Sequence, residues 1–570
     1  MAFLTEEGRK ADRPGLPRRR DYPSVMTGTE LTARPLERTH LVVNQTPPLH
    51  RLDPLACDPA LVSAVRAFGS DGVLDSLAAV ARESGSAEAR EHGRLANEHP
   101  PVLHTHDRYG NRVDEVEFHP SWHWLMTRAV AHGLHAAPWA PDAGEHAHLR
   151  RAAAFALWSQ VEAGHGCPIS MTYAVIPALR HEPSLAAVYE PGLLSSAYDF
   201  GMRPPAAKAG LLAGMSMTEK QGGSDVRVNS TTATPSGDGT YALVGHKWFT
   251  SAPMNDLFLT LAQAPGGLTC FLLPRVLPDG TRNALRLQRL KDKLGNKSNA
   301  SAELEYTGAT GWRVGAEGRG VRTIIEMVTM TRLDCVLGST SNIRAALTEA
   351  AHHAAHRTAF GSSLREHPAM TAVLADLALE SEGATVLAMW LASLVDSGSP
   401  LLRLALPAAK FTVCKRAPGV VAEALECLGG NGYVEESGLP RLYREAPLMS
   451  IWEGSGNVTA LDVLRAVQRE PLTVEALWQE LASTAGADSR LDGAVAELRA
   501  EIADPAPERA RRVAELIALC LQASLLLRVS PVVGEAFVAS RLGARSGVLG
   551  VLPRGVPVRD LVDRVTPAAR

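Results

Sequence analysis

Apolar residues recur at steps of three and four along most of the chain, which is the pattern of amphipathic helices. Between about 47 and 210 this spacing predicts a mostly helical region. Four long stretches with the same spacing and short connections lie between about 320 and 469, and they predict a four-helix bundle. The last hundred residues, from about 471, are again predicted to be helical before a tail rich in Gly and Pro.

The period changes after Gly214. Short segments rich in β-branched and aromatic residues follow, punctuated by Gly, Pro and Asp: Y-A-L-V-G-H-K-W-F-T-S, D-L-F-L-T-L-A-Q-A, L-T-C-F-L-L-P-R-V and S-A-E-L-E-Y. This pattern predicts strands joined by hairpins. Helical stretches do not alternate with them, which disfavours a parallel Rossmann-type sheet. The sequence therefore predicts a mainly α protein with a central antiparallel β-domain.

These patterns divide the chain into five segments. They are an N-terminal arm (1–46), a helical domain (47–212), the β-domain (213–312), a four-helix-bundle domain (313–470) and a C-terminal helical domain (471–570). The arm is polar and rich in Arg, Pro and Thr, and we expect it to be mobile. A chain of 570 residues exceeds what one hydrophobic core usually serves, in agreement with several domains.

Composition excludes several classes. The net charge of −3 gives no global attraction to nucleic acid or membrane. Seven dispersed cysteines without a C-x-x-C pair are typical of reduced thiols. Two histidines on one helical face, His352 and His356, make a poor metal site, so no metal is predicted. No apolar run of about 18 residues and no signal peptide is recognised, and we expect a cytoplasmic protein that does not enter the membrane.

Charge is nevertheless uneven. Residues 509–570 contain ten Arg, no Lys and four acidic residues, a local excess of six positive charges. Two interpretations are open: a solvated face that aids solubility, or a surface that contacts the phosphate backbone of DNA.

Two stretches are candidates for chemistry. M-S-M-T-E-K-Q-G-G-S-D (215–225) combines glycines, which permit close backbone approach, with the short hydroxyl side chains of Thr218 and Ser224. An ordinary polar turn is the alternative. In S-I-W-E-G-S-G-N (450–457) Glu453 follows Trp452. A carboxylate in a dry aromatic pocket has a raised pKa, which suits a general base, whereas an exposed loop acid is the alternative.

The order of these segments and motifs resembles the acyl-CoA dehydrogenase flavoprotein superfamily, from about 50 to 470. Further matching stretches are K-W-F-T-S (247–251), R-T-A-F-G (357–361), L-G-G-N-G-Y (428–433) and L-Y-R-E-A (442–446). Within the superfamily the chain most resembles the AidB-type adaptive-response flavoproteins, which also carry an extra C-terminal helical domain. The stretches that carry this resemblance are G-R-L-A-N-E-H-P-P (93–101), C-P-I-S-M-T (167–172), L-K-D-K-L-G-N-K-S-N-A-S (290–301) and P-R-L-Y-R-E-A-P-L-M-S-I-W-E-G-S-G-N (440–457).

The resemblance implies an FAD site between the β-domain and the four-helix domain. It implies that FAD is contacted by Met217, Thr218, Gly223, Ser224, Phe249, Thr250, Ser251, Gly454 and Ser455, and Asn457 and Arg465 also fall where AidB-type proteins approach FAD. Four more residues match positions that reach the FAD of a neighbouring subunit, which implies a homo-oligomer, usually a tetramer: Arg357, Phe360, Gly429 and Gly430.

Glu453 matches the catalytic carboxylate of the family, which removes the proton α to a thioester while hydride leaves the β-carbon for FAD. One departure concerns the D-x-x-R motif of efficient CoA-ester dehydrogenases. Here Thr329 replaces the acid, which argues against efficient turnover, and Arg332 either anchors a ligand or pairs within the bundle.

Two hypotheses follow. The first is a DNA-associated flavoprotein that protects against or responds to alkylation damage, with at most weak dehydrogenase activity. Its DNA contacts would be Arg511, Arg512, Arg541 and Arg545. The second is an acyl-thioester dehydrogenase without a DNA role. A flavin-bound protein without turnover is a third option.

Overall fold

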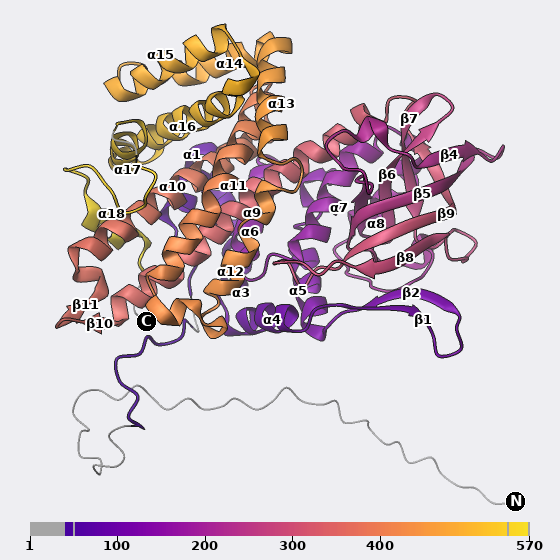
Figure 1. Cartoon of the computed structure of the whole chain (residues 1–570), viewed down its shortest axis with the longest axis horizontal. Coiled ribbons are helices and arrows are strands. Elements are labelled where there is room, and N and C mark those ends of the chain that lie inside the picture. Colours follow the sequence, from indigo (N-terminus) through magenta and orange to yellow (C-terminus); the bar gives the residue numbers. More distant parts are fainter. Residues whose placement is uncertain (1–39, 50–51, 544–545, 568–570) are drawn as a thin grey trace, which may run out of the picture.

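The computed structural model describes residues 40–49, 52–543 and 546–567 (Figure 1). Most of the predicted N-terminal arm, residues 1–39, lies outside the described residues. The described end of the arm contacts the end of the helix that closes at His356 and the short strand that follows it. The side-chain amide of Asn44 bonds to both the backbone N–H and the carbonyl of Thr358, each at 2.8 Å. Thr46 Oγ1 lies 2.9 Å from Nδ1 of His353.

The N-terminal region is mainly helical but contains one hairpin. Its helices are α1 (Pro59–Phe68), α2 (Asp71–Ser76), α3 (Ala78–Ser84), α4 (Ala87–Glu98), α5 (Pro120–Ala131), α6 (Ala147–Ser159), α7 (Gly166–Leu179) and α8 (Pro183–Leu193). Between α4 and α5, β1 (Val102–His106) pairs with β2 (Arg112–Glu117) in antiparallel register. Pro100 and Pro101 follow α4 and cannot continue a helix, because proline lacks an N–H. Periodicity alone missed this hairpin because each strand is so short.

The β-domain is a single seven-stranded sheet. Its strands are β3 (Ala213–Ser216), β4 (Thr232–Pro235), β5 (Thr240–Ser251), β6 (Leu257–Ala264), β7 (Gly267–Pro274), β8 (Leu285–Leu290) and β9 (Ser301–Val314). The order β3-β6-β4-β5-β9-β7 closes on itself through β6–β7, and β8 pairs with β9. The sheet is mainly antiparallel, as predicted, with short parallel pairings of β3 and β4 with β6. β3 is parallel because it enters from the helical region and not through a hairpin.

The four helical patterns of the next region form three long helices, which corrects the predicted count. They are α9 (Gly320–His356), α10 (Pro368–Asp396) and α11 (Leu402–Glu426). The first two patterns belong to the single helix α9, because residues 331–342 between them contain no proline and continue its buried face. The shorter helices α12 (Leu439–Glu445) and α13 (Gly456–Arg469) complete the packing around α11.

The C-terminal helices pack onto this bundle (Figure 1). They are α14 (Pro471–Ala482), α15 (Ser489–Ala503), α16 (Ala510–Val529), α17 (Pro531–Val538) and α18 (Val558–Val565). α16 packs on α11 and α13, and α18 returns to α10. One apolar core runs from α1 to α18, and a second lies between α7, the sheet and the start of α9. Of the helices described here, none combines the length and apolarity needed to cross a bilayer.

Candidate active site

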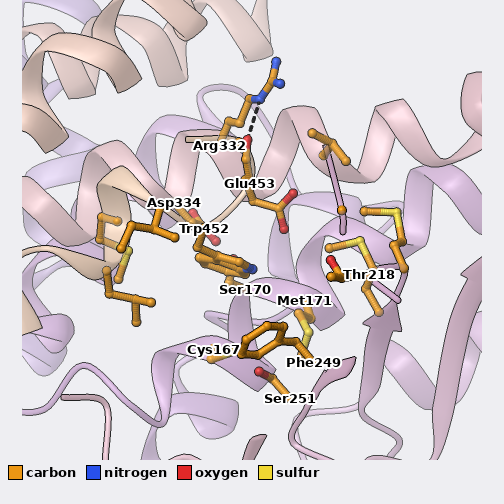
Figure 2. Close-up of a pocket in the computed structure, with 18 of the residues that line it drawn as sticks. Cys167, Ser170, Met171, Thr218, Phe249, Ser251, Arg332, Asp334, Trp452 and Glu453 are labelled. Carbon is orange, nitrogen blue, oxygen red and sulfur yellow. Dashed lines mark hydrogen bonds between the residues drawn. The ribbon is translucent and has the colours of Figure 1, made fainter. Parts of the chain in front are cut away.

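A cavity of about 540 Å³ opens where α7, the β-domain, α9 and the 450–457 loop meet. Its walls combine the two stretches that the sequence singled out, although more than 200 residues separate them. The predicted residues that line it are Met217, Thr218, Gly223, Ser224, Phe249, Ser251, Arg332, Glu453, Gly454 and Ser455. Figure 2 shows the Glu453 carboxylate pointing into the space between Trp452 and Thr218, with Phe249 below Trp452 in this view.

The loop after β3 is held by a buried carboxylate that the sequence analysis did not single out. Glu219 accepts hydrogen bonds from the backbone N–H groups of Ser230 (2.7 Å) and Thr231 (3.1 Å). The ammonium of Lys247 on β5 donates to it at 3.0 Å, and both side chains of this pair are fully buried. These contacts hold the pKa of Glu219 below its usual range despite burial. The neighbouring Thr218 is thereby fixed at the cavity wall.

Strand β5 supplies alternate side chains to the cavity, as the period of a strand requires. Phe249 is 49% exposed and Ser251 also faces the cavity, where its hydroxyl lies 3.0 Å from that of Ser301. Thr250, between them, is fully buried and its hydroxyl lies 2.5 Å from that of Ser216. A contact between the Thr250 side chain and FAD therefore does not fit this geometry.

The catalytic candidate sits on a strained turn. Glu453 has φ of +57°, a left-handed conformation that non-glycine residues seldom adopt. Neighbouring helices clamp its loop: Arg332 Nε on α9 donates to the Glu453 carbonyl at 3.2 Å, and the ammonium of Lys410 on α11 donates to the Gly454 carbonyl. The thiol of Cys335 lies 3.8 Å from the Trp452 carbonyl. These contacts hold the strained conformation in place.

Burial raises the pKa of Glu453 to about 7, and the nearby charges of Arg332 and Lys410 only partly oppose this shift. Its Oε1 atom is shielded from solvent and has no hydrogen-bond partner among the described residues. A carboxylate without a partner on this oxygen is free to accept a proton from a ligand. The site therefore has the geometry and proton affinity of a general base near neutral pH.

Arg332 lines the cavity, but it has an ionic partner inside the protein. Its Nη1 donates to Asp462 on α13 at 2.6 Å. The sequence left open whether Arg332 anchors a ligand or pairs within the bundle, and in the structure it pairs with an acid of the helical region. Asp462 was not recognised from the sequence, because it lies 130 residues away and carries no motif.

Sequence analysis also missed two charged residues of the cavity wall. Asp334 on α9 forms a buried ion pair with Arg151 on α6, whose guanidinium stacks on the Tyr173 ring at 4.1 Å. Lys293 donates to the Asn299 carbonyl at 2.6 Å, and burial lowers its pKa. Lys293 belongs to the 290–301 motif, so that motif was the available signal for it. For Asp334 no signal was available.

Six of the predicted FAD residues lie away from the cavity. Arg357 and Phe360 are at the β10–β11 hairpin (Thr358–Ala359 and Ser362–Ser363), far from the β-domain in Figure 1. Phe360 is 99% exposed, and the Arg357 guanidinium donates to the Asn44 carbonyl. The other four are exposed residues outside the cavity lining, and Arg465 pairs with Asp462 at 3.0 Å: Gly429, Gly430, Asn457 and Arg465.

The arginines predicted to contact DNA differ from one another. Arg541 is only 9% exposed and pairs with Asp376 and Glu380, so the prediction that it contacts DNA is wrong for this conformation. Arg512 pairs with Glu497 and Glu515. Arg511 is exposed, and its guanidinium lies 5.6 Å from the Phe411 ring. Arg545 lies outside the described residues.

No metal centre is indicated within the described part of the chain, since no three His, Cys, Asp or Glu residues are grouped to hold an ion. The cavity does fit a flavin. It is mainly apolar, with an aromatic ring from Phe249 and short hydroxyl donors from Thr218, Ser224 and Ser251 at its edge. Gly223 is also required there, because a Cβ at this position would lie 2.4 Å from Thr218 Oγ1.

Family comparisons agree with this geometry. Residues 44–200 match the family described as Adaptive response protein AidB N-terminal domain. Residues 214–309 and 318–468 match the middle and C-terminal domains of acyl-CoA dehydrogenase.

Individual relatives cover from 78% to 95% of the chain. "Putative acyl-CoA dehydrogenase AidB" of Escherichia coli (strain K12) is 47% identical over 518 residues, 90% of this chain and 96% of that protein. "Acyl-CoA dehydrogenase family member 11" of Caenorhabditis elegans is 32% identical over 78% of this chain and 75% of its own length. The structure of Caenorhabditis elegans ACDH-11 in complex with C11-CoA superposes with a TM-score of 0.78, at 27% identity, over 95% of this chain and 96% of that one.

FAD is the cofactor of this family, and the cavity residues described above fit it. The resemblance predicted from the motifs is thus confirmed by family models between residues 44 and 468 and by a relative over 90% of the chain. The chain belongs to the acyl-CoA dehydrogenase family of FAD-dependent oxidoreductases, in the group of the adaptive response protein AidB.

Proposed function

We propose that this protein dehydrogenates an acyl thioester and that Glu453 removes the α-proton. The observation that carries the proposal is the carboxylate itself. It projects into the cavity with no hydrogen-bond partner for Oε1 among the described residues, and its pKa is raised to about 7. A base with this proton affinity matches the task of accepting a weakly acidic proton near neutral pH.

The chain's own residues orient and isolate the reacting groups. Arg332 and Lys410 hold the carbonyls of Glu453 and Gly454, so the base keeps one direction. Trp452 and the apolar wall exclude water, which strengthens electrostatic interactions inside the cavity. Thr218, Ser224, Phe249 and Ser251 would hold FAD on the β-domain side, where it supplies the acceptor for the hydride from the β-carbon.

Support for a CoA thioester comes from a relative. The ACDH-11 structure, which superposes on nearly this whole chain, is described as a complex with C11-CoA. We extend that ligand class to this protein as part of the proposal. Thr329, in place of the acid of D-x-x-R, supports slow turnover.

The test is anaerobic bleaching of the bound flavin by straight-chain acyl-CoA thioesters from butyryl to palmitoyl. We expect at least one to bleach the wild-type protein, and Glu453→Gln to keep its yellow flavin without bleaching. Glu436→Gln, an exposed acid outside this cavity, is the matched control and should bleach like the wild type. Equal bleaching by Glu453→Gln, or none by the wild type, contradicts the proposal.

We also infer a homo-oligomer, built as a tetramer in the manner of the family. Phe360 is 99% exposed on a hairpin tip and has φ of +52°, and its ring meets His367 edge-on with 6.0 Å between the ring centroids. Gly429 and Gly430 are likewise exposed, with no atoms within 4 Å of a Cβ built at either position. In the proposed assembly these residues contact the FAD of a neighbouring subunit.

Light scattering coupled to size exclusion tests the assembly. Phe360→Asp should reduce the measured mass and the FAD content together. Val244→Asp, another exposed apolar side chain, lies on the β-domain and should change neither. A wild-type protein that runs as a monomer with full FAD contradicts the inference.

A second candidate function is association with DNA in an alkylation response. It is supported by the match to the adaptive response protein AidB and by Arg511, which is exposed and forms no ion pair within the described residues. Duplex DNA should bind through phosphates, with strong salt dependence and little sequence preference. Absence of binding at low salt removes this candidate and leaves the dehydrogenase proposal untouched. For either function we keep the cytoplasm as the proposed location.

A further inference from the structure

Three arginines converge on one carboxylate behind the catalytic loop. Asp462 on α13 is 6% exposed. It accepts hydrogen bonds from Arg332 Nη1 at 2.6 Å, from Arg403 Nη2 at 3.0 Å and from Arg465 Nη1 at 3.0 Å. Arg403 has a second partner in Glu470, at 2.9 Å. Asp462 is therefore the anionic centre of this cluster.

Arg332 is the member of the cluster that faces the active site. Its Nε donates to the carbonyl of Glu453, while the carboxylate of the same residue points away into the cavity (Figure 2). One guanidinium thus bridges the Asp462 carboxylate and the backbone of the catalytic residue. An arginine presents five donors and binds a carboxylate well in a bidentate fashion.

A nearby carboxylate oxygen without a partner competes with Asp462 for the guanidinium of Arg332. Glu453 Oε1 has no partner among the described residues, and Arg332 is the cation that most affects this carboxylate. Rotation of Arg332 toward the cavity would convert the free base into an ion pair. Because an ion-paired carboxylate holds a proton less well, that pair would weaken the base.

We propose that Asp462 is a positioning residue that holds Arg332 behind the catalytic loop and so keeps the Glu453 carboxylate free of an ion pair. This inference rests on the proposed role of Glu453 as the base. It assigns a function to the acid on α13 and explains how an arginine lines the cavity without neutralising its carboxylate.

The other charged groups around Glu453 are already occupied. The Lys410 ammonium on α11 donates to the Gly454 carbonyl. The thiols of Cys335 on α9 and Cys167 on α7 stay protonated near neutral pH, since burial raises the pKa of both, that of Cys167 to about 11.

Two further ionic groups of the cavity wall also have partners. Asp334 on α9 is paired with Arg151, and Lys293 from the loop before β9 donates to the Asn299 carbonyl and to Ser301. Burial remains the largest cause of the raised pKa of Glu453, and Arg332 is the charged neighbour with the largest effect on it, so the partner of Arg332 is the one that the inference concerns.

Asp462→Asn in the FAD-loaded protein tests this inference, because it removes the charge and keeps the shape. The pH midpoint of kcat/KM for acyl-CoA bleaching should fall by about one to three units from that of the wild type, the usual effect of a new ion pair on a carboxylate. A second readout needs no turnover. The visible absorption of the bound flavin, titrated with pH, should show the same shift, and Glu453→Gln should abolish the transition.

Two variants separate positioning from a general structural effect. Glu470→Gln removes the other partner of Arg403 but does not touch Arg332, so its midpoint should equal that of the wild type. Asp462→Asn combined with Arg332→Gln removes the released cation and should bring the midpoint back to the wild-type value or above it. Lower FAD content or thermal stability of Asp462→Asn without a shifted midpoint overturns the inference.

Folding of the variant need not limit the test. Asp462→Asn takes one ionic partner from each of three arginines. Adding Arg403→Gln removes one of these three guanidinium groups. The double variant should show the same downward shift, and an unshifted midpoint there also overturns the inference. If instead the wild type bleaches and Glu453→Gln bleaches equally, the proposed function fails and not only the role of Asp462.

Discussion

The active-site cavity and the C-terminal arginine-rich region differ in whether their ionisable groups have partners. In the cavity, Glu453 keeps one carboxylate oxygen buried and without a partner among the described residues. In the C-terminal region, six of the eight described arginines between 509 and 564 form ion pairs with acids, most of which come from earlier in the chain. Burying a charge without a partner is costly, so buried charged groups in proteins are usually ion-paired or hydrogen-bonded. The difference therefore indicates where the protein keeps a group free for chemistry.

The same comparison changes how the local charge excess is understood. The acidic partners include Asp376 and Glu380 on α10 and Glu480 on α14, so the six excess positive charges counted along the sequence do not form one open surface. Arg511 and Arg554 are the described arginines of this segment for which no ion pair is formed within the described residues. A DNA contact would have to be built from few residues.

The largest expected effect is on the rate of flavin bleaching, when the unpartnered carboxylate of the cavity is removed. Glu453→Gln removes the proton acceptor and should slow acyl-CoA bleaching by about 10²–10⁴-fold, the range typical of a lost general base. Stopped-flow bleaching under anaerobic conditions measures it. An effect below tenfold would mean that the unpartnered oxygen of Glu453 is not used as a base.

Arg541 tests whether the paired arginines are structural. Arg541→Gln leaves Asp376 and Glu380 facing a neutral side chain in the interior, and should lower the free energy of unfolding by about 3–5 kcal/mol. Arg509→Gln is the control, since the Arg509 side chain of its pair with Glu501 is half exposed and solvent screens the pair, so the loss should be much smaller than for Arg541→Gln. Urea unfolding of the two variants compares them, and equal losses would contradict the assignment.

A smaller effect follows from the raised pKa of Glu453. Its ordinary pKa is 4.5 and burial raises it to about 7. Between these values the folded protein holds a proton that the unfolded chain has released, so stability falls as pH rises through this window. Glu453→Gln cannot ionise and should exceed the wild type in unfolding free energy by up to about 3 kcal/mol at pH 8. Urea unfolding at pH 4 and pH 8 measures this, and the gain should vanish at pH 4.

The smallest effect concerns Arg511, the exposed exception among the arginines. If DNA binds there, Arg511→Gln should weaken binding similarly for different sequences and reduce the salt slope by about one. Its unfolding free energy should change by less than about 0.5 kcal/mol, as for other surface substitutions. Fluorescence titration with duplex DNA at several salt concentrations measures the slope. An unchanged slope together with intact binding would move the DNA contact elsewhere.

Much of the candidate site was predictable because its motifs are contiguous. M-T-E-K-Q-G-G-S-D and W-E-G-S-G-N identified Thr218, Ser224 and Glu453, and the family assignment has been confirmed. Backbone conformation at glycines and the placement of a base next to an aromatic ring are local properties, so a short stretch of sequence carries them. The switch of apolar spacing at Gly214 likewise predicted the β-domain.

The remaining features depend on long-range contacts. Three features could be seen only in the packed structure. They are the union of two helical patterns in α9, the side of the strand on which Thr250 lies, and the β1–β2 hairpin. Arg332 could be read either as a ligand anchor or as a bundle residue until Asp462 was seen beside it.

Contiguous motifs and apolar spacing were enough to predict the family, the cofactor and the alternation of helical and β regions, and they singled out Glu453 as the proposed base. Only the packed structure shows which ionisable groups lack a partner. The Oε1 atom of Glu453 has none among the described residues, whereas Arg541 and Arg332 form ion pairs with acids from distant segments. The physical reason is that a motif fixes residue types over a few positions. The pKa of a carboxylate and the availability of an arginine depend on burial and on partners, and the fold brings those from anywhere in the chain.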